Sequence, residues 1–161
     1  MLPPYATLTS ENPVCVDGTP SSLPPELINA YLNTWYEVAL PARAVVCTLQ
    51  IGVPSPVLLN TMQQQGVRQA SLITPCNPRS EVLSPVDNER RMQQLRDDLL
   101  QEGWRWTAAF GRDPISQWPG EDSLLVWHMT AVQASEWGQR WQQNAVLHID
   151  GNAVPHLLLL R

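Results

Sequence analysis

The feature that most constrains the fold is a helix with clear end signals that separates two short strand-like runs. Ser84 is a favoured N-cap residue, Pro85 suits the first helical position, and Gly103 is a typical helix stop. The flanking runs, residues 69–74 and 104–110, have the length and composition of strands. Because a strand–helix–strand unit normally joins parallel neighbours, we predict a mixed, partly parallel sheet.

Similar signals assign the rest of the chain. One helix follows Pro24-Pro25, another runs from Ser55 to Gly66, and a third opens at Thr130 with a capping-box pattern. Further strands are predicted over residues 35–40, 46–51, 123–129, 145–150 and 154–160.

Length and composition limit the classes of protein to which the chain can belong. A chain of 161 residues fits one α/β domain, here residues 22–161, with a mixed sheet flanked by about four helices. Residues 1–21 hold several prolines without periodicity and are predicted to form an irregular N-terminal arm. The net charge of −5 disfavours nucleic acid and anionic membranes as partners. The sequence contains no signal-like N-terminus and no apolar run of membrane-spanning length, so we expect a soluble, cytoplasmic protein.

The cysteines give no indication of a metal site. Cys15, Cys47 and Cys76 are odd in number and far apart, which favours neither a disulfide framework nor zinc. Cys76 lies in a polar segment, but no histidine is near in sequence to activate it as a nucleophile. We therefore predict no metal and no cofactor, and expect reduced thiols.

Strand direction is predicted to bring three polar clusters to one edge of the sheet. Strand 69–74 ends there, and the crossover makes strand 104–110 end at the same edge. The next strand starts there, because the Pro- and Gly-containing residues 111–122 are a poor returning helix. The helix from Thr130 then carries the chain back, so Gln143-Asn144 arrives at this edge too. Ligands of open α/β sheets favour such a position.

The side chains expected at this edge are carboxylates, amides, hydroxyls, guanidinium groups and an indole. The predicted catalytic residues are Glu121 and Asp113. The predicted ligand-binding residues are Thr74, Asn77, Arg79, Ser80, Asn88, Arg112, Trp118, Ser123, Gln143 and Asn144. An amide presents a donor and an acceptor together, which suits a polar ligand.

Glu121 is the best candidate acid or base. It lies between Trp118-Pro119 and the apolar residues 124–126, which can remove water from its carboxyl group and raise its pKa. The alternative is an ion pair with Arg112 or a capping role. Asn77 also has a structural alternative, because Asn before Pro favours a turn.

A basic cluster offers a second interpretation. Arg79 near the helix start at Ser84 is suited to holding a phosphate, but Asp87 in the same turn would repel an anion. Arg90, Arg91 and Arg96 fit a solvated helix face, so nucleic-acid binding is disfavoured.

The polar segments resemble a bacterial family catalogued only as a domain of unknown function. The matching motifs are I-T-x-x-N-P-x-S at 73–80, an Asn at the helix start (Asn88), G-x-D-P-x-x-x-W-P-x-E-x-S-L-L-V at 111–126, and Q-N-A at 143–145. The resemblance extends over roughly residues 27–150. It implies that the family shares Asn77, Ser80, Asn88, Asp113, Trp118, Glu121, Gln143 and Asn144. It implies no activity.

Two functions are compatible with these patterns. The first is binding of a small polar ligand, for example a nucleotide-like one, with metal-independent hydrolysis or group transfer in which Glu121 is acid or base. The second is a non-catalytic interaction module, for example a regulatory or defence-associated one, that binds an unknown protein partner. A closed pocket favours the first, whereas a flat edge rimmed by exposed Trp104, Trp106 or Trp118 favours the second.

Overall fold

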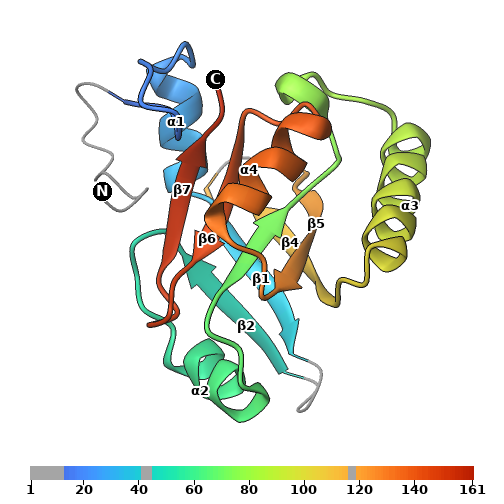
Figure 1. Cartoon of the computed structure of the whole chain (residues 1–161). Coiled ribbons are helices and arrows are strands. Elements are labelled where there is room, and N and C mark those ends of the chain that lie inside the picture. The colour runs from blue at the N-terminus through green and yellow to red at the C-terminus, as the bar shows by residue number, and fades with distance from the viewer. Residues whose placement is uncertain (1–12, 41–44, 116–118) are drawn as a thin grey trace.

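The computed structural model describes residues 13–40, 45–115 and 119–161 (Figure 1). Its helices are α1 (Pro25–Leu32), α2 (Pro56–Gln65), α3 (Pro85–Gln101) and α4 (Ala131–Arg140), with a short 3-10 turn at Pro78–Ser80. Its strands are β1 (Trp35–Leu40), β2 (Val45–Gln50), β3 (Ala70–Ile73), β4 (Trp106–Arg112), β5 (Glu121–Trp127), β6 (Ala145–Ile149) and β7 (Pro155–Leu159).

The seven described strands form one sheet in the order β2-β1-β4-β5-β3-β6-β7. Every neighbouring pair is antiparallel, so the prediction of a mixed, partly parallel sheet is wrong. β3 and β4, which α3 connects, do run in the same direction, but β5 lies between them and pairs with both. The connection through α3 places β4 two positions away from β3 in the sheet. The chain then folds back after β4 through a short connection, and β5 takes the position between β3 and β4.

The helix ends follow the capping chemistry of the sequence. The side chain of Ser84 accepts a hydrogen bond from the Asp87 backbone N–H at the start of α3. Thr130 and Gln133 form a reciprocal capping box at the start of α4. Each cap satisfies backbone donors that have no partner within the helix, which fixes where these helices begin.

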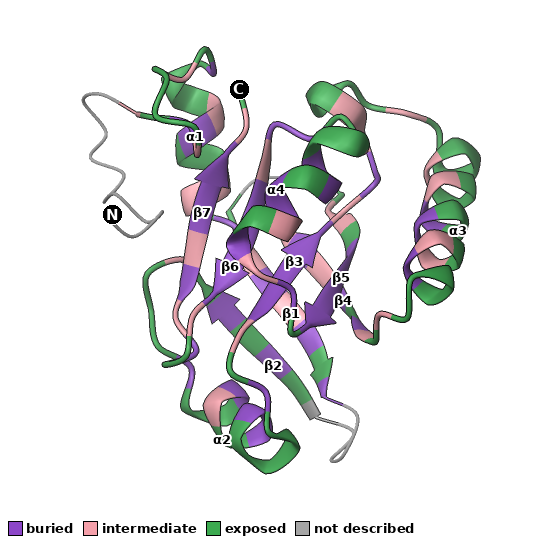
Figure 2. Ribbon diagram, viewed as in Figure 1, coloured by how far each residue is buried: buried purple, intermediate pink, exposed green. Residues whose placement is uncertain are grey.

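The sheet curls, and each of its two faces carries its own hydrophobic core (Figure 2). α1 and α2 contribute to the core on the inner face, which also joins residues of the two edge strands, such as Leu49 of β2 and Leu157 of β7. α3 and α4 cover the outer face. The curl brings the two edge strands, β2 and β7, close together. The Gly52 N–H, just after β2, donates to the carbonyl of Pro155 in β7 over 2.8 Å. The inner face is therefore concave and can hold a cavity.

Part of the predicted N-terminal arm packs against the sheet. Residues 1–12 lie outside the described residues, but Cys15 is buried in the inner core. The Val16 N–H donates to the Leu159 carbonyl over 3.0 Å, and the Ser21 hydroxyl donates to the Arg161 carbonyl. The described part of the arm thus covers the outer edge of β7, which would otherwise leave backbone groups without partners.

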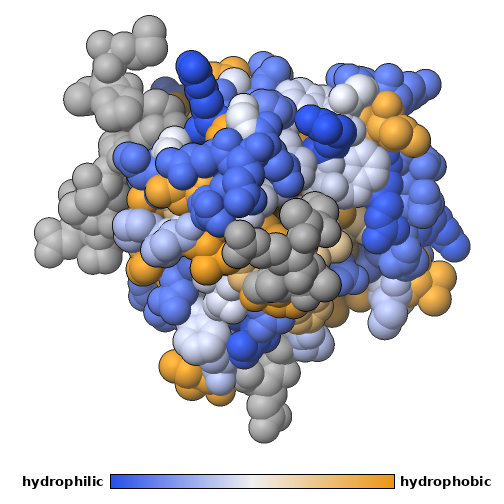
Figure 3. Space-filling model, turned by 90° about the horizontal axis from the view of Figure 1, so that it is seen from below, coloured by the Kyte–Doolittle hydropathy of each residue, from blue (hydrophilic) through white to orange (hydrophobic). Residues whose placement is uncertain are grey.

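Exposed apolar side chains occur in small groups on the surface. Val46, Val53 and Val57 are about half exposed or more, and they line a second cleft of 280 Å³ beside the start of α2. Seen from below, the molecule shows hydrophobic atoms as separate patches among hydrophilic ones (Figure 3).

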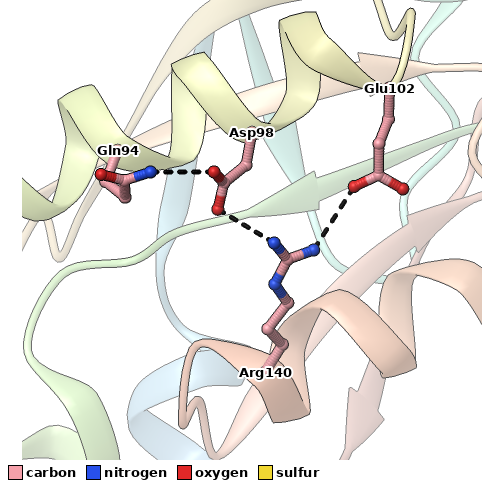
Figure 4. Close-up of polar contacts among 4 residues, drawn as sticks. All are labelled: Gln94, Asp98, Glu102 and Arg140. Carbon is pink, nitrogen blue, oxygen red and sulfur yellow. Dashed lines mark hydrogen bonds and ion pairs between the residues drawn. The ribbon is translucent and has the colours of Figure 1, made fainter.

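An ion-pair cluster fastens α3 to α4 (Figure 4). The guanidinium group of Arg140 lies 3.1 Å from the Asp98 carboxylate and 3.3 Å from that of Glu102. Gln94 donates a further hydrogen bond to Asp98. Because Arg140 and Glu102 are largely exposed, each pair contributes at most about 1 kcal/mol. The cluster links the last turns of the two helices, whereas the buried Met92, Leu95 and Leu99 pack α3 against the outer core.

Candidate functional site

A cavity of about 370 Å³ opens on the inner face, between α1 and the edge of the sheet at which β3 ends. Leu72, Leu147 and Leu157 contribute apolar walls, and Leu27 and Ala30 of α1 lie on the side facing them. The volume is near the lower end for small-molecule sites, which are mostly apolar with a few polar groups. The cavity therefore suits a ligand smaller than a typical drug.

Seven predicted site residues line this cavity. They are Thr74, Asn77, Ser80, Asp113, Glu121, Ser123 and Gln143. They meet because β3 and β4 end at the edge where β5 and β6 begin, as the strand directions predicted. The antiparallel register places Gly111 opposite Glu121, and Tyr36 opposite Gly111.

Glu121 is the acid at the centre of the site. Its carboxylate accepts a hydrogen bond of 2.9 Å from the side-chain amide of Asn77. Burial raises the pKa of Glu121 from 4.5 to about 7, against the opposing effect of hydrogen bonds from Asn77 and Thr74. Near neutral pH this carboxyl group can therefore either donate or accept a proton.

Asn77 is held so that only its amide nitrogen can face Glu121. The Asn77 side-chain oxygen accepts from the Leu83 backbone N–H and from the Asn88 side-chain amide, each over 2.9 Å. The Asn88 side-chain oxygen in turn accepts from the Asn77 backbone N–H over 3.0 Å. Since backbone N–H groups can only donate, these contacts fix the orientation of both amides. Asn88 thus positions Asn77 from the first turn of α3 without lining the cavity.

The third polar cluster supports the loop after β3. Gln143 donates to the Cys76 carbonyl over 3.1 Å and lines the cavity. Asn144 is buried, donates to the Ser80 hydroxyl over 2.9 Å, and accepts from Arg161 over 3.2 Å. Asn144 is not among the lining residues, so its contact with the cavity is through Ser80.

Besides Asn88 and Asn144, two described site residues, Arg112 and Arg79, do not line the cavity. Arg112 lies on the opposite face of β4, 2.5 Å from the Glu37 carboxylate and with its guanidinium 5.1 Å from the centroid of the Trp35 ring. Successive side chains of a strand alternate between faces, so Gly111 faces the cavity and Arg112 points away. Arg79 is exposed and is not a lining residue. Trp118 lies outside the described residues.

Two tyrosines that the sequence analysis did not assign to the site also line the cavity. Tyr31 of α1 has its hydroxyl 3.3 Å from that of Ser80, and burial raises its pKa. Tyr36 of β1 is buried, which raises its pKa well above the usual range. A side chain at Gly111 would come within 3.3 Å of the Tyr36 ring, so the glycine makes room for it. In the sequence, Tyr31 lies at helical spacing from the apolar Leu27 and Ile28, and no motif distinguishes Tyr36 from core residues.

The cationic and thiol side chains near the site have structural roles. Arg91 donates to the Pro75 and Trp141 carbonyls over 2.6 and 2.9 Å, which ties the loop after β3 to the end of α4. Arg90 and Arg96 form ion pairs with Asp87 and Glu89. Burial raises the pKa of Cys76 to about 11, so its thiol stays protonated at neutral pH.

Residues 73–146 match the model of the family described as Protein of unknown function (DUF3293). The resemblance to an uncharacterised family is thereby confirmed over residues 73–146, a shorter range than the predicted 27–150, and all of its motif segments fall inside the match. Tyr31, Tyr36 and Arg161 lie outside it. No curated protein and no solved structure gives a significant match to the chain. In the described part of the chain, no helix has the length and apolar character needed to cross a membrane.

Proposed function

We propose that the protein binds a small ligand in this cavity and that Glu121 acts on it as a general acid or base. The observation that carries the proposal is a cavity-lining carboxyl group whose pKa lies at about 7. The reaction that fits best is a metal-independent hydrolysis or group transfer, because such a carboxyl group can take a proton from water and return it to a leaving group. We place the protein in the cytoplasm, consistent with three free, buried cysteines.

The surroundings of Glu121 support a division of roles. Asn77 holds the carboxyl group in one orientation, and Ser123, two residues along the same strand, faces the same cavity. Asp113 is a second acid among the lining residues, and its carboxylate accepts from the Ile115 backbone N–H over 2.8 Å. Pairs of acids in different environments are typical of enzymes that need one proton donor and one acceptor.

Glu121→Gln tests the catalytic role. The change keeps the size and one acceptor oxygen for the Asn77 amide but removes the proton that can be transferred, so we expect turnover to fall by about a hundredfold or more. The substrate is first sought by mass spectrometry of small molecules that copurify with the wild-type protein, and its turnover is then measured for both proteins. Asp122→Asn, which changes the exposed neighbour, is the matched control and should retain activity. Unchanged turnover in Glu121→Gln with intact circular dichroism would remove Glu121 from the mechanism.

The second candidate function is a non-catalytic interaction module. The exposed valines around the cleft beside α2 favour it, because grouped apolar side chains are common at protein interfaces. Against it, Trp104 and Trp106 are half-buried and pack on the outer core instead of rimming a flat surface. The cavity with its near-neutral acid therefore supports the ligand-binding function better.

A further inference from the structure

We infer that the ligand of this cavity is a small organic cation, an amine with an apolar body, held by the Glu121 carboxylate and the rings of Tyr31 and Tyr36. The inference rests on the proposed ligand-binding function and specifies the chemical class of the ligand.

The charges around the cavity are of one sign. Glu121 and Asp113 are acidic, and the lining residues in the described part of the chain include no arginine or histidine. The neighbouring guanidinium groups of Arg112, Arg161 and Arg91 contact Glu37, Asn144 and backbone carbonyls instead. A phosphate or carboxylate ligand would therefore meet the Glu121 carboxylate, and none of the described lining residues would balance its charge. The net charge of −5 adds an attraction for cations over the whole molecule.

Glu121 is surrounded by groups that do not compensate its negative charge. Tyr31 faces it from α1, Tyr36 from β1, and Cys76 from the loop after β3, and all three are neutral at pH 7 because burial raises each pKa. Asp122, its neighbour on β5, opposes ionisation of Glu121. Asn77 supplies only a neutral amide donor. An ammonium group in the cavity would supply the missing positive charge and would favour the ionised carboxylate.

The walls of the cavity suit the rest of such a molecule. Tyrosine rings attract cations through their π faces, and desolvation strengthens the attraction. Leu72, Leu147 and Leu157 offer an apolar surface for the body of the ligand. Ser123 can accept a further hydrogen bond from an ammonium group. An apolar amine satisfies all of these surfaces at once.

Three ring compounds that differ mainly in charge test the inference: benzylamine, benzyl alcohol and benzoate. Their affinities for the full chain are measured by NMR titration at about pH 8.5 and about pH 5.5, well above and below the pKa of Glu121. We expect benzylamine at the higher pH to bind about tenfold more tightly than benzoate and to shift resonances of Tyr31, Tyr36 and Ser123. At the lower pH this preference should shrink severalfold, because Glu121 is then protonated.

Variants assign the effect to Glu121. Glu121→Gln should weaken benzylamine severalfold at the higher pH and leave benzyl alcohol unchanged, whereas Asp122→Asn should change neither by more than about twofold. Tighter binding of benzoate or benzyl alcohol in the cavity would overturn the cation inference and leave the ligand-binding proposal standing. Failure of all three probes to shift cavity resonances also overturns it. The ligand-binding proposal falls with it only if no small molecule copurifies with the protein.

Discussion

At the scale of single residues, the site depends on an amide that has no freedom to rotate. Asn77 adopts a left-handed backbone conformation, with φ of 46°, and its side-chain oxygen is occupied by two donors. Its nitrogen is thereby directed at Glu121. Asn tolerates this backbone region better than most residues, and this explains why Asn rather than Gln occupies the position. The structural turn is thus observed, and the same residue also holds Glu121. Contact of its amide with a ligand, the alternative in the sequence, stays a prediction.

A pair of glycines tests the backbone beside Glu121. Gly120 and Gly103 have the same φ of +82°, but a side chain at Gly120 would collide with the Phe110 ring and lie 2.8 Å from the Gly111 carbonyl oxygen. Nothing lies within 4 Å of a side chain at Gly103. We expect Gly103→Ala to lower the free energy of unfolding by about 1 kcal/mol through backbone strain alone, and Gly120→Ala to lower it by about 2 kcal/mol or more.

Urea unfolding of the two glycine variants measures this difference. Equal losses of stability would mean that the close approach of Gly120 to Phe110 and Gly111 is absent in solution.

The position of a side chain relative to the cavity could be predicted from the sequence where chemistry is local, but not where the fold decides. Glu121, Asn77 and Gln143 were identified because polar groups interrupt apolar runs at strand ends. Arg112 was assigned to the site on proximity in sequence, but strand alternation turns it to the opposite face. Tyr31 and Tyr36 were missed because a tyrosine on an apolar stripe looks the same whether it borders a core or a cavity.

At the scale of elements, strand direction was predictable and strand adjacency was not. Each helix between two strands reverses the chain, so the ends of β3 and β4 and the starts of β5 and β6 fall on one edge. Which strands become neighbours depends on competition among pairings. The connection between β4 and β5 is short, so these strands pair directly, and β5 then separates β4 from β3. The wrong prediction of sheet type did not change which residues meet at the cavity, because their meeting depends only on the directions in which the strands run.

At the scale of the whole molecule, two buried groups give the stability opposing dependences on pH. Glu121 has a folded-state pKa of about 7 against 4.5, so its contribution to stability is lost as pH rises between these values. His148 is buried beside Ser71, and burial lowers its pKa from 6.5 to about 4. Its contribution is lost as pH falls through that range. Each titration changes the free energy of unfolding by at most about 3 kcal/mol. The two changes have opposite signs, so they largely cancel in the pH range that both pKa shifts cover.

Glu121→Gln should reveal the contribution of His148. Relative to the wild type, this variant should lose up to about 3 kcal/mol more stability as pH falls from about 6.5 to about 4.5, because the opposing gain from Glu121 is removed. Chemical denaturation across that range measures the difference, with Asp97→Asn, which changes an exposed carboxylate of α3, as control. Parallel pH profiles for Glu121→Gln and the wild type would contradict the opposing roles.

The most direct measurement of the central claim is an NMR titration of the Glu121 carboxyl group in the free protein. The cavity, the apolar walls and the amide of Asn77 together predict a pKa of about 7. Asn77→Ala should move this pKa further upward, because it removes a hydrogen bond that favours the ionised form. A wild-type pKa near the ordinary value of 4.5 would show that the carboxyl group is solvated, and it would contradict a desolvated acid in a ligand site.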